Sequence, residues 1–398
     1  MVSPPSLVTS KSSTPLVHVA AWIQSIGGVE TLLGHHRRRD AAAGFTASQI
    51  ALFDKTGIPG APDYATQRFG GWHTPRGMRR AMRDAFVARP EAIVLYHNGW
   101  GLPWFADSDR SQRRIVCWWD SQTHWGPGLD AVKPWVDGVI CMSDAAAADL
   151  AARWPDLPSE RCGVMRVPIE IPVDLKAGRG PKKEWVIGCA GRLVRSQKRA
   201  DRLVPFVAAL QALDLPYRIE VVSDGPLRTK LQAALGGDAR VEFLGWQSGD
   251  AYGRRMQNWN AMVSFTDHEG GPIVMLEAMA AGVLPVFPDI GGSLVRDYLP
   301  SLSAHCVYPP GDVTAAAQRM QALWQLDEAE TAQLQDRARG VAEGHTGERY
   351  HAAFTEFVHR IDALPRSSRP ATGSRGSRWC DLMPLGALTR LAPGTLWR

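Results

Sequence analysis

Two carboxylates in the second half of the chain, Glu269 and Glu277, are separated by seven residues in a setting that could bind a ligand. Residues 261–266, before them, are short, apolar and partly β-branched, which predicts a buried parallel strand. Pro272 fits a first helical position, and Gly282 fits the end of that helix. Glu269 is therefore expected in a loop at the carboxyl end of a strand. Glu277 is expected on a helix, about 7.5 Å along the axis from Pro272 at roughly 1.5 Å per residue.

A helix N-terminus is predicted between the two carboxylates. Its backbone N–H groups would make it a ready anion site. This arrangement suits a ligand with a central diphosphate and a hydroxyl-rich group on each side, which describes a nucleotide-diphospho-sugar. Taken alone, the two glutamates could equally be ordinary solvated residues. The residues of the predicted N-terminus are Gly270, Gly271, Pro272 and Ile273.

A second candidate anion site contains Arg192 and Lys198, which follow the apolar strand pattern of residues 185–189. An arginine forks to two oxygens and a lysine acts as a point charge, so the pair could clamp a diphosphate from the side opposite a helix N-terminus. Arg195 and Arg199 crowd the same segment. Either Lys198 or a neighbouring arginine could then make the second phosphate contact.

Near the start of the chain, Gly27 and Gly28 lie between a strand pattern at residues 15–22 and a helical stretch. A glycine pair at such a junction lets the backbone approach a phosphate closely, although a tight turn needs the same residues. His124 follows another strand pattern, at residues 113–120. A single histidine in a loop is more often structural than catalytic, and His73 and His97 compete with it as candidates for a catalytic contact.

The Glu269 and Glu277 pattern resembles the E-x7-E signature of retaining glycosyltransferases of family 4, which have a GT-B fold. The Gly-Arg segment at Arg192 resembles a second motif of that family, with one departure. The family places its lysine five residues after the arginine, whereas Lys198 follows Arg192 by six. A strand that runs into Asp-Gly-Pro at residues 217–226 resembles a third element. The resemblance covers roughly residues 15–364.

The resemblance implies front-face transfer, in which the leaving diphosphate accepts the proton of the acceptor hydroxyl. It implies no metal and no cofactor beyond the nucleotide-diphospho-sugar, which is a co-substrate. Glu269 would hold donor-sugar hydroxyls, Glu277 the ribose, and His124 the donor sugar at the transferring centre. The catalytic residues expected are Glu269, His124, Arg192 and Lys198. The donor-binding residues expected are Gly27, Gly28, Arg192, Lys198, Gly270, Gly271, Pro272, Ile273 and Glu277.

The predicted fold is α/β, a GT-B arrangement of two Rossmann-like doubly wound domains facing a cleft, with a C-terminal crossover helix. At 398 residues the chain exceeds what one hydrophobic core usually organises. Strand patterns alternate with helix patterns throughout both halves, and the strands expected in the first domain lie near residues 16–22, 47–53, 92–97, 113–119, 138–142 and 163–167. The expected divisions are a flexible N-terminus (1–14), an acceptor-side domain (15–175), a linker (176–184), a nucleotide-sugar-binding domain (185–345), a crossover helix (346–365) and a tail (366–398), disordered or a weak membrane or partner segment.

Composition favours a cytoplasmic protein whose cysteine thiols are in the reduced state. The sequence has no apolar leader and no run long enough to span a bilayer, and its six cysteines are scattered. The net charge of +5 is modest, but basic residues gather at residues 35–39 and 68–89. An anionic membrane surface or a solvated helix face would explain them. Interspersed acids and the absence of a nucleic-acid motif argue against nucleic-acid binding.

The predicted function is hexose transfer from a nucleotide-diphospho-sugar to a glycan or lipid-linked acceptor, in cell-surface polysaccharide or lipopolysaccharide biosynthesis and peripheral to the inner face of the plasma membrane. Fifteen tryptophans, several of them between residues 100 and 135, could line an acceptor groove, since indole faces suit sugar rings. Two alternatives remain. One is a nucleotide-sugar epimerase of the same fold, and the other is a non-catalytic nucleotide-sugar-binding scaffold.

Overall fold

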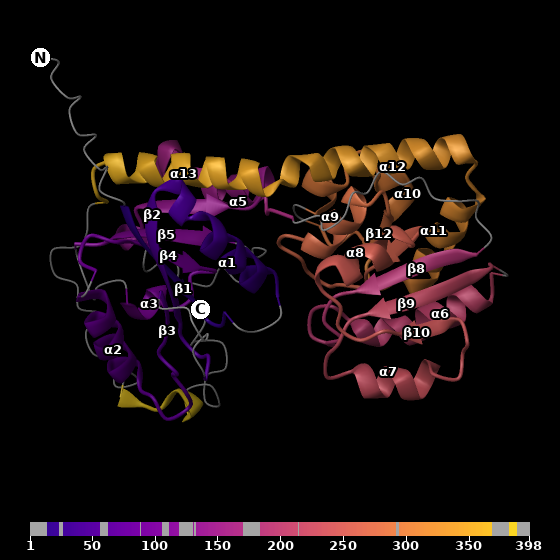
Figure 1. The fold of residues 1–398 in the computed structure, drawn as a ribbon, viewed down its shortest axis with the longest axis horizontal. Helices are drawn as coiled ribbons and strands as arrows, with labels where there is room; N and C mark the ends of the chain where they lie inside the picture. Colours follow the sequence, from indigo (N-terminus) through magenta and orange to yellow (C-terminus); the bar gives the residue numbers. More distant parts are fainter. Residues whose placement is uncertain are drawn as a thin grey trace, which may run out of the picture.

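The structure is a computed structural model, and it describes residues 14–23, 27–55, 63–87, 89–105, 111–118, 130, 133–169, 184–213, 215–291, 294–367 and 382–387. Within these residues the chain forms two parallel β-sheets, which belong to two domains lying side by side (Figure 1). The predicted pair of Rossmann-like doubly wound domains is confirmed. No helix in the described part of the chain is both long enough and apolar enough to span a membrane.

The first sheet has seven described strands in the order β3-β2-β1-β4-β5-β6-β7. Every neighbouring pair is parallel. The chain turns to the other side of β1 after β3, so the order reverses between β1 and β4. Such a reversal opens a crevice at the carboxyl ends of the two strands. The strands are β1 (Thr14–Ala20), β2 (Phe45–Ala51), β3 (Tyr64–Thr66), β4 (Ile93–His97), β5 (Arg113–Trp118), β6 (Gly138–Cys141) and β7 (Cys162–Val164).

Helices cover both faces of this sheet. Met78, Met82 and Phe86 recur every four residues along α2 and are buried against one face, so the helix forms because it has a continuous apolar stripe. On the opposite face, α1 and the last long helix pack over a separate apolar cluster. The helices of this domain are α1 (Gly28–Arg39), α2 (Pro75–Val87), α3 (Leu102–Phe105) and α5 (Asp144–Arg153), with 3₁₀ turns at Ala41–Ala43, Lys133–Trp135 and Ser159–Arg161.

The second sheet repeats the same topology in the order β10-β9-β8-β11-β12-β13, again parallel throughout the described strands. Its reversal lies between β8 and β11. One large apolar cluster joins this sheet to its helices. The strands are β8 (Trp185–Ala190), β9 (Tyr217–Val222), β10 (Val241–Phe243), β11 (Ala261–Val263), β12 (Leu284–Pro288) and β13 (Val307–Tyr308). The helices are α6 (Leu203–Gln211), α7 (Arg228–Leu235), α8 (Gly249–Gln257), α9 (Ile273–Ala280), α10 (Ser303–Cys306), α11 (Val313–Gln325) and α12 (Glu328–Ala342), with short helical turns at Ala200–Arg202, Leu294–Tyr298 and Glu343–His345.

The last long helix, α13 (Gly347–Ala363), returns from the second domain to lie over the first (Figure 1). Phe357 and Ile361 are buried there against the sheet. The sheet has glycine where these side chains enter. A Cβ at Gly138 would lie 2.8 Å from Ile361, and one at Gly163 would lie 2.7 Å from Phe357. The predicted crossover helix is therefore confirmed, and it forms part of the core of the first domain.

The tail contributes one described segment, residues 382–387, which packs on the first domain. The backbone N–H of Leu385 donates to the carbonyl of His73 at 2.8 Å, and that of Gly386 donates to Gly71 at 2.7 Å. Leu385 is buried in the apolar cluster around α2. The predicted linker, residues 176–184, lies outside the described residues except for Glu184.

Candidate functional site

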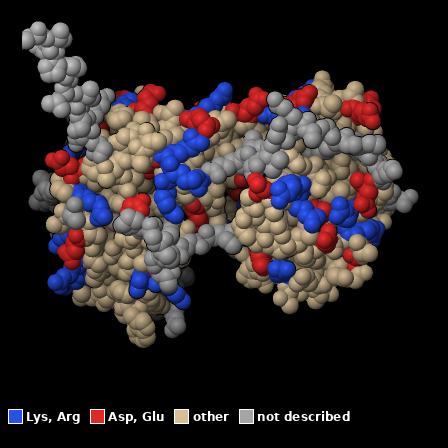
Figure 2. All heavy atoms as spheres, in the orientation of Figure 1, with Lys and Arg blue, Asp and Glu red and all other residues tan. Residues whose placement is uncertain are grey.

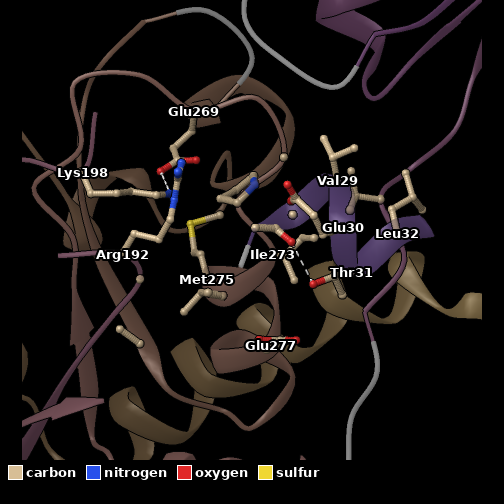
Figure 3. Close-up of a pocket in the computed structure, with 18 of the residues that line it drawn as sticks. Val29, Glu30, Thr31, Leu32, Arg192, Lys198, Glu269, Ile273, Met275 and Glu277 are labelled. Carbon is tan, nitrogen blue, oxygen red and sulfur yellow. Dashed lines mark hydrogen bonds and ion pairs between the residues drawn. The ribbon is translucent and has the colours of Figure 1, made fainter. Parts of the chain in front are cut away.

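A cavity of about 980 Å³ lies between the two domains. Its walls are the loops that follow β1 and β4 in the first sheet and β8, β10 and β11 in the second. Both topological reversals therefore open onto the same space, and this is where doubly wound domains bind ligands. Figure 3 shows the two walls facing one another, with Glu30 and Thr31 of α1 opposite Arg192, Lys198 and Glu269 of the second domain.

Glu269 lies in the loop after β11 and forms an ion pair with Lys198, which comes from the loop after β8 (Figure 3). The Glu269 side chain is only 6% exposed, whereas that of Lys198 is 26% exposed and faces the cavity. A backbone hydrogen bond of 2.9 Å from the N–H of Asp267 to the carbonyl of Gln197 holds the two loops together. The buried carboxylate thus fixes the position of a cavity-facing cation.

Arg192 lines the same wall of the cavity. Its guanidinium donates to the side-chain oxygen of Gln197 at 3.0 Å, and the Gln197 amide donates to the carbonyl of His268 at 3.2 Å. Of the two alternative cations, Arg199 pairs with Asp267 at 2.8 Å and Arg195 lies 3.6 Å from Asp201. Neither is among the described residues that line the cavity, so the geometry favours Lys198 as the partner of Arg192.

Helix α9 points its N-terminus into the cavity. Pro272 is its N-cap and Ile273 its first residue, one position later than predicted, and no side chain of the described residues caps it. Gly270 and Gly271 precede it on the cavity wall. A Cβ at Gly271 would lie 2.6 Å from Val167 of the first domain, so glycine is required for the two domains to approach this closely. The N–H of Ile273 donates to the carbonyl of Gly271 at 2.9 Å, so an anion would be met by the N–H groups that follow it in the first turn.

Glu277 lies one turn further along α9 and lines the cavity beyond the helix N-terminus, away from Glu269 (Figure 3). Burial and the neighbouring Glu277 carboxylate raise the pKa of Tyr252, on α8, well above its ordinary value. Tyr252 therefore keeps its proton at neutral pH and lies close to Glu277. Glu269 and Glu277 therefore lie on either side of the N-terminus of α9, and the binding of an anion between them stays a prediction.

Across the cavity, Gly27 is the N-cap and Gly28 the first residue of helix α1, and the Glu30 carboxylate of the first turn lies beside Gly27. A Cβ at Gly28 would come within 3.4 Å of Ile273 at the start of α9. The N-termini of α1 and α9 therefore approach one another from opposite domains. The positive electrostatic potentials of the two helix dipoles add in the space between them. His124, the remaining predicted catalytic residue, lies outside the described residues.

Sequence reasoning expected Trp100 near an acceptor groove but missed Trp22, and both residues line the cavity on its first-domain wall. Trp22, 43% exposed, contacts Phe53 and Trp100, with ring centroids 5.5 Å and 5.8 Å away. Trp22 stands at the carboxyl end of the strand predicted at residues 15–22, and this position at a strand end could have marked it as a site residue. On the other wall, Trp246 follows β10 and is 49% exposed. By contrast, Trp118 and Trp135 of the predicted tryptophan cluster belong to the core.

Comparisons with known proteins agree with this architecture. Residues 184–326 match the family model described as "Glycosyl transferases group 1". No curated protein matches the sequence.

Several solved structures share the fold. The apo form of the lipopolysaccharide outer core galactosyltransferase WaaB is 18% identical, with a TM-score of 0.64 over 87% of this chain and 99% of that one. Sucrose-phosphate synthase from Thermosynechococcus elongatus is 17% identical, with a TM-score of 0.67 over 88% and 99%. A structure titled "Trehalose-6-phosphate from E. coli bound with UDP-2-fluoro glucose" is 13% identical, with a TM-score of 0.65 over 89% and 100%. The family match and the fold together support a GT-B glycosyltransferase.

Proposed function

We propose that this protein is a retaining glycosyltransferase that moves a hexose-type sugar from a nucleotide-diphospho-sugar to a glycan or lipid-linked acceptor. One observation carries the proposal. The cavity brings together the N-termini of α1 and α9 and the cations Arg192 and Lys198, and these groups lie between Glu269 and Glu277. A diphosphate with a ribose on one side and a sugar on the other matches that order of groups.

In the proposed complex, the diphosphate lies between the N-terminus of α9 and the side chains of Arg192 and Lys198. Glu277 accepts hydrogen bonds from the ribose, and Glu269 accepts them from the donor sugar. Structural neighbours support this class of donor. One is bound with UDP-2-fluoro glucose, and another is the pneumococcal O-GlcNAc transferase GtfA in complex with UDP and GlcNAc. The choice of base falls to the loop after β10, where Trp246 offers an aromatic face.

The proposed reaction breaks the bond between the anomeric carbon and the diphosphate while the acceptor hydroxyl attacks from the same face. The departing diphosphate oxygen accepts the hydroxyl proton. Arg192, Lys198 and the α9 amides stabilise the negative charge that develops on the leaving group, which is why no catalytic metal is invoked. His124 is assigned to the donor sugar at the transferring centre.

The acceptor is assigned to the first domain. The Trp22, Phe53 and Trp100 group gives its wall flat apolar faces, which suit the apolar faces of sugar rings. The structural neighbour WaaB is a lipopolysaccharide outer core galactosyltransferase, which supports an acceptor in cell-surface polysaccharide or lipopolysaccharide synthesis. Such an acceptor would be reached at the cytoplasmic face of the plasma membrane.

Basic side chains on the first domain fit that location. Figure 2 shows Lys and Arg side chains gathered over α1, and Arg76, Arg80 and Arg83 of α2 are exposed. The basic run at residues 35–39 is only partly a surface feature, however, because His35 and His36 are buried. Each exposed cation near an anionic membrane contributes about 1 kcal/mol.

The deciding experiment incubates the protein with radiolabelled UDP-, GDP- and dTDP-sugars and a membrane extract. Transfer into lipid-linked material, with the donor's anomeric configuration kept in the product, is expected. Interconversion of donor sugars would instead indicate an epimerase, and binding without turnover would indicate a scaffold.

Membrane docking has a separate test. Sedimentation with anionic vesicles should decrease as salt rises, since the Debye length is about 8 Å at physiological ionic strength. Replacing Arg76, Arg79, Arg80 and Arg83 with Gln should abolish sedimentation and leave hydrolysis of the donor in solution intact. Wild-type protein that ignores such vesicles at low salt would point to a soluble acceptor.

A further inference from the structure

A buried cluster of titratable side chains lies beneath α13, apart from the cavity. It joins three elements that are distant in the sequence: β1, α1 and the crossover helix. No member of it lines the cavity among the described residues. Its only local signal in the sequence is a histidine and an aspartate four residues apart on α1, and the sequence-based expectation was that no metal-ligand cluster is present. The cluster consists of His18, His36, Asp40, His97, Tyr350 and His351, all buried.

The carboxylate of Asp40 lies at the centre. Its Oδ2 is 3.0 Å from Nε2 of His18, and its Oδ1 is 3.0 Å from Nδ1 of His36. One ligand atom from each of these three side chains lies within 4.8 Å of the others. Zinc bonds of about 2.0–2.2 Å to nitrogen and oxygen place tetrahedral ligand atoms roughly 3.4 Å apart, so the two contacts of 3.0 Å at Asp40 would lengthen slightly when the ion binds. Small side-chain rotations would provide that change.

The outer nitrogen of each imidazole has a partner as well. Nδ1 of His18 lies 3.0 Å from Nε2 of His97, and Nε2 of His36 lies 2.8 Å from the hydroxyl of Tyr350. A metal-bound histidine almost always donates its other ring N–H to a fixed acceptor, which sets its tautomer and orientation. His97 and Tyr350 are placed to serve as those acceptors, so both shells of a metal site are present.

A hydrogen-bonded network alone does not explain why the imidazole of His351 is buried beside Asp40. Its side chain is only 10% exposed, and its Nε2 is 3.6 Å from Oδ1 of Asp40. Neither ring nitrogen has a hydrogen-bond partner among the described residues. A buried nitrogen without a partner costs free energy, and so does a buried carboxylate without a cation. A metal ion at this point would satisfy both groups.

We propose that His18, His36, Asp40 and His351 bind a tetrahedral divalent transition-metal ion, and that this ion is zinc. Three imidazoles and one carboxylate form a nitrogen and oxygen donor set that suits zinc, and four ligands from the protein describe a closed, structural site. The ion fastens α13 to β1 and α1. It thereby stabilises the helix that connects the two domains, and it takes no part in transfer.

The test begins with the wild-type chain produced in medium supplemented with zinc, and separately with cobalt. Because the site is buried, the metal should enter during folding and resist dialysis. Elemental analysis is expected to give about one metal ion per chain, and the cobalt form should show the visible absorption of a tetrahedral nitrogen and oxygen site without a thiolate charge-transfer band. Protein refolded with zinc should melt about 5 °C higher than protein refolded with a chelator.

Two variants and a matched control locate the site. Asp40→Asn and His351→Gln should retain less than about a tenth of the metal. His345→Gln should retain it fully, because His345 is another buried histidine but bonds to the carbonyl of Val167, away from the cluster. Metal-free wild-type protein from zinc medium would overturn the proposal and leave a hydrogen-bonded network only. Equal metal content in the wild type and in Asp40→Asn would also overturn it, since the ion would then lie elsewhere.

Discussion

Neutralising Glu269 should separate donor binding from transfer. In the structure the Glu269 carboxylate holds the ammonium of Lys198, so an incoming diphosphate must compete for that cation. Two unit charges about 4 Å apart attract by about 4 kcal/mol at an effective dielectric constant of about 20. Because about a quarter of the Lys198 side chain is open to solvent, we take half of that value, about 2 kcal/mol or about 30-fold in affinity.

We therefore expect Glu269→Gln to bind a free nucleoside diphosphate as tightly as the wild type or up to about 30-fold more tightly. Its turnover should fall about 100-fold, since the donor sugar loses a charged partner. Lys198→Ala should bind the nucleoside diphosphate about 10-fold more weakly, because a charge-assisted contact is lost. Calorimetric titration with UDP, GDP and dTDP measures these affinities, and initial rates at saturating donor measure turnover.

Glu277→Gln is the matched control, since it also removes one carboxylate from the same cavity. It should weaken nucleoside diphosphate binding about 10-fold or more, because its expected partner is the ribose and not the sugar. The reasoning is refuted if Glu269→Gln weakens binding as much as Glu277→Gln does. Such a result would mean that the two carboxylates do not lie on opposite sides of the phosphates.

Three further outcomes follow from the structure. Trp22→Ala should raise the KM for the acceptor and leave nucleoside diphosphate affinity unchanged, and a parallel loss of both would contradict the acceptor assignment. Gly188→Ala should lower the Tm, because its Cβ would lie 2.1 Å from Trp259, and overpacking costs about 1–3 kcal/mol. Gly237→Ala, with nothing within 4 Å, should leave the Tm unchanged. Burial lowers the pKa of His345 to about 4, so its contribution to stability is complete above about pH 6.5 and is lost as pH falls toward 4. Urea unfolding at pH 7 and pH 4.5 should show the wild type losing about 2 kcal/mol more than His345→Asn, and equal losses would exclude this histidine as the cause.

The strands were predictable because their signals are local. Apolar, β-branched runs predicted strands near residues 16–22 and 47–53, and the structure has them at Thr14–Ala20 and Phe45–Ala51. Both strands begin two residues before the predicted position. Pairing between the two strands sets their limits, and an apolar pattern in the sequence does not. The strand Tyr64–Thr66 was missed altogether. It has three residues and no apolar run, and it exists because it pairs with β2.

In the candidate site, too, the residues with a local sequence signal were predictable and the contacts between distant segments were not. The glycine pairs and the carboxylates follow strand ends, and parallel strands bring their carboxyl ends to one edge, so the predicted donor-binding residues all line one cavity. Contacts between separate segments carry no such signal. The ion pair of Lys198 with Glu269, the Trp22 group and the burial of His36 under α13 each join parts of the chain whose proximity only the folded structure reveals.

The crossover helix also has a consequence for synthesis on the ribosome. The first domain completes its sheet with Val164, but α13, which covers one face of that sheet, begins only at Gly347. At ~5–20 residues per second, the nascent domain waits roughly 10–40 s for its last helix. During that time the sites that receive Phe357 and Ile361 lie open, with apolar strand residues around them. A chain that terminates anywhere before residue 347 therefore releases a first domain with an exposed apolar face, which chaperones and proteases recognise.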